Sequence, residues 1–125
     1  MRDIKFRFYD TLKKEMFSTD DMNSYEVWDC ICDERFIPMQ YTGLKDKNGV
    51  EIYEGDILCA GNEKYKGIVI YYEGTAHFRV DVYLNNKRVC RQSVVEFMEK
   101  RARAIRMNCL VIGNIHQHKH LIDNN

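Results

Sequence analysis

The sequence lacks several features that would define other classes of protein. It has one proline in 125 residues, and its nineteen basic and nineteen acidic residues cancel. With 45% hydrophobic and 12% aromatic residues, the composition is typical of a folded globular protein and argues against a disordered chain. The neutral total charge gives no support to a polyanionic partner.

Membrane-spanning and secretory segments are also missing. No apolar run approaches the roughly 20 residues that a transmembrane helix needs, so no membrane partner is expected, and no N-terminal segment resembles a signal peptide. The cysteines are odd in number and scattered, which favours reduced thiols in a cytoplasm. They are Cys30, Cys32, Cys59, Cys90 and Cys109. The length predicts a single domain, residues 1–125, with a core of its own.

The strongest turn signals lie in the central stretch Met39–Leu58, MQYTGLKDKNGVEIYEGDIL. Asn48-Gly49 is a dipeptide that tight hairpin turns favour, because both central residues of such a turn need a positive φ. Gly55 permits a bend or bulge before the apolar run that begins at Ile57. This stretch therefore predicts a strand, a hairpin, a corner and another strand.

Alternating apolar residues predict several short strands around this centre. The first, residues 4–9, would be half-buried, with Ile4, Phe6 and Phe8 on one face and Lys5, Arg7 and Tyr9 on the other. Polar residues 10–15 would close a hairpin with a second strand at Met16 and Phe17. Further strands are expected at residues 36–40, 66–72, 76–84, 88–91 and 109–112, and Gly74 marks a hairpin turn between residues 66–72 and 76–84. Short strands with turn signals about every ten residues predict a mainly β fold, a small barrel or roll with additional hairpins.

One short C-terminal helix is expected as well. Ser93 and Glu96 form a capping box, and the apolar residues between and after them predict a helix that ends near Arg101. The polar tail, residues 116–125, is expected to be frayed or to form one helical turn.

Residues 18–35 form an acidic segment with six acidic residues and one basic residue, a net charge of −5. We expect a solvated excursion from the fold. Its large apolar residues Tyr25, Val27 and Trp28 are expected to hold it against the core, because aromatic side chains bury much apolar area.

Three segments of the chain resemble the YopX family of bacteriophage and prophage proteins. They are MRDIKFRFYD with Met16, the central MQYTGLKDKNGVEIYEGDIL, and VIGNI at Val111–Ile115. Tyr9 stands where the family usually has Trp, and a histidine-rich tail replaces the family's acidic ending. The resemblance implies a Src-homology-3-like barrel core, a bacterial host cytoplasm and no established activity. It marks as turn and corner residues Gly43, Asp46, Asn48, Gly49, Gly55 and Asp56.

Glu54 and Asp56 are a candidate carboxylate pair for acid–base or metal chemistry, because residues two apart on a strand share a face. Gly55 interrupts that alternation, so we prefer a structural role in which Asp56 accepts backbone amides at a barrel corner. No serine or cysteine with a neighbouring histidine suggests a nucleophile. The sequence thus predicts no catalytic residue, and a hydrolase is only a third interpretation.

The tail histidines His116, His118 and His120, with Cys109 upstream, are residue types that zinc accepts. On a strand the three histidines would share a face. Their spacing matches no known zinc pattern, so a solvated tail is the preferred interpretation. We predict neither a metal nor a cofactor.

Residues 87–106 are basic, with seven basic and two acidic residues and a net charge of +5. A nucleic-acid backbone could be contacted there, and the candidate residues are Lys100, Arg101, Arg103 and Arg106. The preferred alternative is that these side chains pair with the acidic residues 18–35 of the same chain or of a second copy.

The preferred function is that of a non-enzymatic phage or prophage accessory protein that binds another protein in the host cytoplasm, self-association included. Nucleic-acid binding through residues 87–106 is the alternative. Within the central stretch, the polar groups expected to face a partner belong to Tyr41, Thr42, Lys45 and Glu54.

Overall fold

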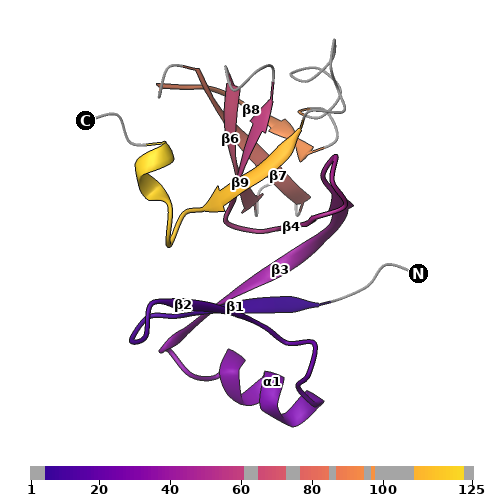
Figure 1. Ribbon diagram of the computed structural model, residues 1–125, viewed down its shortest axis with the longest axis vertical. Coiled ribbons are helices and arrows are strands. Elements are labelled where there is room, and N and C mark those ends of the chain that lie inside the picture. The colour runs from indigo at the N-terminus through magenta and orange to yellow at the C-terminus, as the bar shows by residue number, and fades with distance from the viewer. Residues whose placement is uncertain are drawn as a thin grey trace.

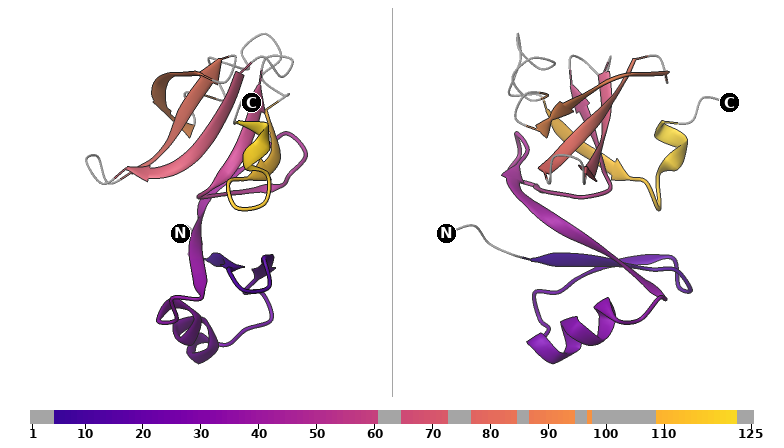
Figure 2. Two further views of the ribbon diagram at one scale, coloured as in Figure 1. Left: turned by 90° about the vertical axis from the view of Figure 1, so that its left-hand side faces the viewer. Right: turned by 180° about the vertical axis from the view of Figure 1, so that it is seen from behind.

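The computed structural model describes residues 5–60, 65–72, 77–84, 87–94, 97 and 109–122. This part of the chain is mainly β, as predicted, with two antiparallel sheets, one short α-helix and a C-terminal 3-10 turn (Figure 1). One of the sheets curls into a half-barrel (Figure 2). Among the described helices, none has the length and apolar character needed to cross a membrane.

The elements have the following bounds. They are β1 Phe6–Asp10, β2 Glu15–Ser18, α1 Ser24–Ile31, β3 Phe36–Lys45, β4 Glu51–Tyr53, β5 Asp56–Ala60, β6 Tyr65–Tyr72, β7 His77–Leu84, β8 Lys87–Ser93, β9 Leu110–Asn114 and the 3-10 helix η3 Lys119–Leu121.

The first sheet has the strand order β2-β1-β3-β4. The hairpin of β1 and β2 closes as the sequence predicts, with Phe8 opposite Phe17. Strand β3 is long enough to pair with β1 through its first half and with β4 through its second half. Figure 1 shows β3 running from α1 and the β1–β2 hairpin at the bottom to the half-barrel at the top. The two parts of the molecule therefore share one continuous strand.

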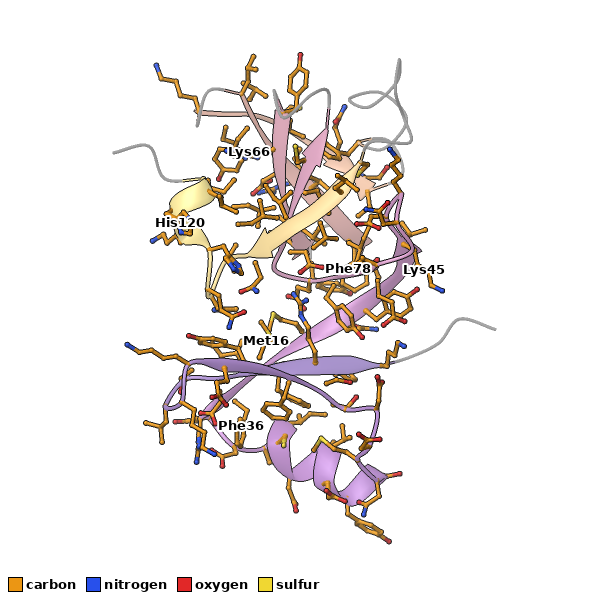
Figure 3. The ribbon with its side chains drawn as sticks, in the orientation of Figure 1. Met16, Phe36, Lys45, Lys66, Phe78 and His120 are labelled. Carbon is orange, nitrogen blue, oxygen red and sulfur yellow. The ribbon has the colours of Figure 1, made fainter. Side chains whose placement is uncertain are left out.

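Both faces of β1 are covered, so the prediction of a half-buried strand is wrong. On the face toward α1, Phe8 is buried and its ring stacks on that of Phe17, with 5.7 Å between centroids. On the other face, Tyr9 is buried and stacks on the ring of His116 at 4.9 Å. Figure 3 shows the same division, with Met16 on the half-barrel side of the hairpin and Phe36 on the α1 side. The face with Tyr9 was expected to be exposed to solvent, because the sequence does not show that the C-terminal tail packs against this strand.

The half-barrel has the strand order β8-β7-β6-β5-β9. Its hairpin of β6 and β7 has an unbroken register from Tyr65 opposite Leu84 to Tyr72 opposite His77. The core inside the curl is made by apolar residues from four strands, from the segment after β8 and from the residue before β9. Its buried members are Ile52, Leu58, Val69, Val80, Val82, Val94, Phe97 and Cys109.

One helix of the described chain was not expected. The predicted C-terminal helix at 93–101 lies mostly outside the described residues; of its described members, Ser93 ends β8, Val94 is helical, and both Val94 and Phe97 are buried. The helix α1 lies within the acidic segment, where only an excursion was expected. The C-terminal tail forms the single helical turn η3, and its Ile122 is buried.

Candidate functional site

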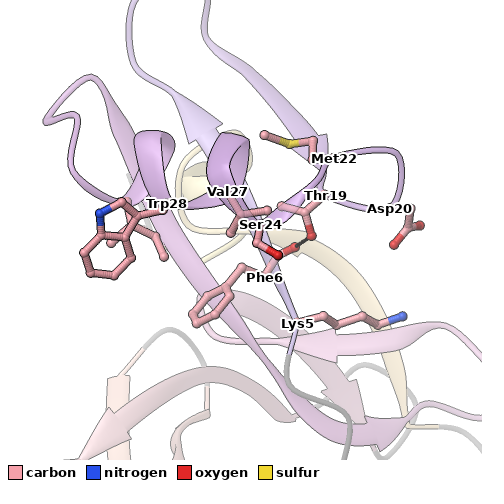
Figure 4. Close-up of a pocket in the computed structure, with 9 residues that line it drawn as sticks. Lys5, Phe6, Thr19, Asp20, Met22, Ser24, Val27 and Trp28 are labelled. Atoms are coloured by element: carbon pink, nitrogen blue, oxygen red, sulfur yellow. Dashed lines mark hydrogen bonds between the residues drawn. The ribbon is translucent and has the colours of Figure 1, made fainter.

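A groove lies beside α1 on the described surface. We call it the α1 groove; its volume is about 420 Å³. It is lined by Lys5, Phe6, Thr19, Asp20, Met22, Ser24, Val27, Trp28 and Ile31. Figure 4 shows Phe6 and Val27 in the middle, Trp28 toward one end, and Met22 and Asp20 toward the other.

Local hydrogen bonds position the helix that forms one wall of the groove. The side chain of Asn23 accepts a hydrogen bond from the Glu26 amide at 2.9 Å, and the Glu26 carboxylate accepts one from the Asn23 amide. This capping box satisfies two of the amides that a helix start leaves without partners. The Thr19 hydroxyl donates to the Phe6 carbonyl at 2.8 Å and ties the entering chain to β1. The Asn23 and Glu26 pattern is the local signal by which sequence reasoning could have found α1.

The helix leaves its large apolar side chains in solvent. Tyr25 is 84% exposed and Trp28 is 64% exposed, whereas Val27 is half-buried. The expectation that both aromatic residues would anchor this segment in the core is therefore wrong. An eight-residue helix covers the sheet with only one narrow face, and that face is too small to bury Tyr25 and Trp28 as well.

The acidic side chains around α1 are not neutralised by described basic residues. The one basic residue of segment 18–35 is Arg35, and it forms an ion pair at 2.7 Å with Asp10, which lies outside the segment. Within the described part of the chain, none of the six acidic residues of segment 18–35 forms an ion pair; they are Asp20, Asp21, Glu26, Asp29, Asp33 and Glu34. These carboxylates also act on the Cys30 thiol. Its pKa is raised by burial and then by the negative charges of the nearby Asp29 and Asp33.

Two described basic residues of segment 87–106 pair within the half-barrel. Arg88 and Arg91 both lie against Asp81, at 3.3 and 2.6 Å. Within one chain, these two arginines therefore do not make the predicted pairing between segments 87–106 and 18–35. Pairing with a second copy stays a prediction. The candidate nucleic-acid contacts Lys100, Arg101, Arg103 and Arg106 lie outside the described residues.

A second, smaller groove of about 300 Å³ lies between the β1–β2 hairpin and β4. Its lining includes Arg7, Asp20, Val50, Glu51 and Tyr53, so Asp20 borders both grooves. The Tyr53 hydroxyl donates to Glu51 at 3.1 Å. Burial, followed by the nearby Glu51, raises the pKa of Tyr53 to about 12, so the phenol stays protonated.

The family-motif residue Asp46 joins the hairpin turn to β9. One carboxylate oxygen accepts hydrogen bonds from the amides of Asn48 and Val50, at 2.8 and 2.9 Å, and the other accepts one from the Val111 amide at 3.0 Å. Gly49 has a φ of +80°, but Asn48 does not have a positive φ. The expected turn with two left-handed residues is thus wrong, because the Asp46 side chain holds a different turn.

The other two motif glycines also have left-handed backbones. Gly43, with a φ of +87°, lies where the pairing of β3 with β4 is irregular. Gly55, also at +87°, makes the corner between β4 and β5, where its amide donates to Val69 and its carbonyl accepts from Ile115. A Cβ at Gly55 would lie 3.1 Å from the sulfur of Met39. Glycine suits this corner because of its positive φ, and a Cβ would also require the Met39 side chain to shift by a few tenths of an ångström.

Asp56 accepts a hydrogen bond from the Tyr53 amide at 2.7 Å, the kind of backbone contact expected at this corner. Its other oxygen forms an ion pair with Arg7, which sequence reasoning missed. The side chain is 1% exposed, and burial raises the pKa of Asp56 against the opposing effect of Arg7. Burial also raises the pKa of Glu54, which is half-buried. Asp56 is thus buried, and both of its oxygens are engaged within the fold.

Only some of the polar groups expected to face a partner lie at the surface. Lys45 is exposed, but Tyr41 and Thr42 are buried, and the Thr42 hydroxyl donates to the Ile52 carbonyl at 2.7 Å. For those two residues the expectation was wrong.

The tail histidines do not share one face of a strand. His116 stacks on Tyr9, and His118 accepts a hydrogen bond from the Asn114 amide at 3.1 Å. Among the described residues, no three His, Cys, Asp or Glu side chains lie close enough together to hold a metal ion.

Two comparisons with known proteins give matches. A family model described as YopX protein matches residues 5–123. The crystal structure of protein EF1440 from Enterococcus faecalis is similar, with a TM-score of 0.62 and 30% identity over 98% of this chain and 100% of that one. No curated protein matches the chain. Neither matching description names an activity, a ligand or a partner.

Proposed function

We propose that the chain, which belongs to the YopX family, is a non-enzymatic protein-interaction module whose contact surface is the α1 groove. One observation carries this proposal: the only tryptophan of the sequence, Trp28, and Tyr25 on the same helix are exposed at a groove with an apolar floor. Tryptophan and tyrosine dominate the residues that contribute most to protein interfaces. The energetic reason to keep Trp28 at the surface is that a partner buries it.

The proposal also includes the cellular location in which the protein acts. The resemblance to a family of phages and prophages supports an accessory role in the cytoplasm of a bacterial host. Such a role needs recognition of a host or phage protein and does not need chemistry.

The geometry gives less support to a hydrolase. Of the two carboxylates considered for catalysis, Asp56 is committed to Arg7 and to the Tyr53 amide. In the α1 groove, the Thr19 hydroxyl is committed to the Phe6 carbonyl. A catalytic group must reach its substrate within hydrogen-bond distance, and these groups are already occupied.

Nucleic-acid binding stays an alternative that rests on Lys100, Arg101, Arg103 and Arg106. The α1 groove itself does not suit it, because its acidic surroundings would repel phosphates. A gel shift at two salt concentrations tests the alternative, which predicts retardation that weakens with salt.

Site-specific photo-crosslinking in the host cell tests the interaction proposal. A photoreactive phenylalanine analogue replaces Tyr25 on α1 and, as a matched control, the exposed Tyr71 on β6. We expect a discrete crosslinked protein from position 25 and none from position 71. Adducts from neither position, or only from position 71, would show that the α1 groove is not the contact surface.

A further inference from the structure

We infer that the partner places a positively charged segment with an apolar anchor residue in the α1 groove. The inference rests on the proposed function and adds the chemistry of the partner. It is drawn from the apolar floor of the groove and from the charges around it.

The floor of the groove fits an apolar side chain. Phe6 and Val27 are half-buried there, and Met22 and Trp28 stand at its two ends. Methionine adapts its shape to different neighbours, which is useful at a binding surface. An aliphatic or aromatic anchor would cover Trp28 and remove its exposed ring from water.

The surroundings of the groove select a cation. Asp20 lines the groove, and Glu26 and Asp29 lie on the helix beside it, all three exposed. Among the described lining residues the only basic one is Lys5, and its ammonium lies 2.5 Å from the Glu51 carboxylate. Because no described basic residue pairs with the carboxylates of segment 18–35, the potential there is negative. Such a surface attracts basic segments and repels acidic ones.

A second copy of the chain is a weaker candidate than a different protein. The exposed arginine of β8, Arg88, and its neighbour Arg91 share Asp81 with each other. Their charge is therefore partly neutralised before any contact with another molecule.

Trp28 is itself the probe for a direct test, because it is the only tryptophan. The full chain is titrated with three synthetic peptides: an amphipathic one of leucine and lysine, its lysine-to-glutamate version, and its leucine-to-serine version. We expect only the first peptide to shift the Trp28 emission to shorter wavelength. The affinity should fall as salt is added, because salt screens exposed charges.

Variants are measured by the anisotropy of the labelled first peptide. Asp20→Asn should weaken binding about 2- to 5-fold, the range of an exposed charge pair. Trp28→Ala should weaken it at least about 30-fold, as for a residue at the centre of an interface. The control Glu15→Gln removes an exposed carboxylate at the far end of β2 and should leave the affinity unchanged.

The outcomes separate the inference from the proposed function. Two outcomes would overturn the inference that the partner segment is positively charged, but not the proposed interaction function. One is equal binding of the acidic peptide, and the other is no binding of any peptide while position 25 still crosslinks to a protein. No peptide binding together with no crosslink overturns both. Light scattering gives a further outcome. If the mass doubles as the Trp28 emission shifts, a second copy of the chain occupies the groove, and the inference that the partner is a different protein is overturned.

Discussion

Arg7 in β1 and Asp56 in β5 form an ion pair that joins the first sheet to the half-barrel across 49 residues of sequence. The Arg7 guanidinium also lies over the ring of Tyr53, with 4.7 Å to its centroid. Tyr53 donates its amide to the same Asp56. A few side chains thus fix how the β1–β2 hairpin sits on the barrel corner.

Replacing Arg7 by methionine should lower the free energy of unfolding by about 3 kcal/mol or more, because it leaves a buried carboxylate without its partner. Urea denaturation measures the change. Asp56→Asn in the same chain should recover part of the loss, since it removes the unpaired charge.

The matched control is Lys5→Met, which breaks the more exposed pair of Lys5 and Glu51. Its effect should be much smaller than that of Arg7→Met. Equal losses from the two variants would mean that Arg7 contributes only as a surface charge.

Gly67 in β6 should not tolerate alanine. A Cβ there would lie 2.2 Å from a methyl carbon of Val80 and 3.3 Å from the Phe97 ring. Gly67→Ala should cost about 1–3 kcal/mol by overpacking the core. Thermal unfolding gives the value.

Val80→Ala supplies the test of that mechanism. If the clash is the cause, the double variant Gly67→Ala with Val80→Ala should be more stable than the sum of the two single effects predicts, by about 0.5 kcal/mol or more. Strict additivity would argue that Gly67 is needed for another reason.

His116 should make stability depend on pH. Its pKa lies below the usual 6.5 because burial, and then the nearby Arg7, disfavour the charged ring. The unfolded chain therefore binds this proton more readily than the folded chain does. The stability that is present above pH 6.5 is lost as the pH falls through the folded-state pKa of His116.

Urea midpoints between about pH 5 and pH 8 measure this loss. His116→Phe keeps a ring against Tyr9 and should show a smaller loss of stability on acidification than the wild-type chain. His120→Gln, at an exposed position, should behave like the wild type. A pH profile that does not change in His116→Phe would assign the titration to another group.

The thiols should differ in their reactivity with a disulfide reagent. Cys32 is exposed, whereas Cys59 and Cys109 are buried, and burial raises the pKa of Cys109 to about 12. Since the thiolate is the nucleophile, the native chain should show a fast phase from Cys32, and Cys109 should react only after unfolding. Cys32→Ser should abolish that fast phase; its persistence would show that another cysteine is more accessible.

The sequence by itself determined the β character of the chain, the hairpin of β1 with β2, the hairpin of β6 with β7, and the corner at Gly55. Each depends on neighbours within a few residues, through the two-residue alternation of strands and the φ that glycine permits. The capping box of Asn23 and Glu26 is equally local, so α1 could also have been predicted.

Only the tertiary structure decided what the faces of these elements meet. Arg7 pairs with Asp56, and Tyr9 stacks on His116 from the other end of the chain. Trp28, expected in the core, lies in solvent on an acidic helix. Such contacts depend on which distant segments the fold brings together, and apolar or charged character alone does not state whether the partner of a side chain is the core, solvent or another molecule. The candidate interaction surface follows from that one placement of Trp28.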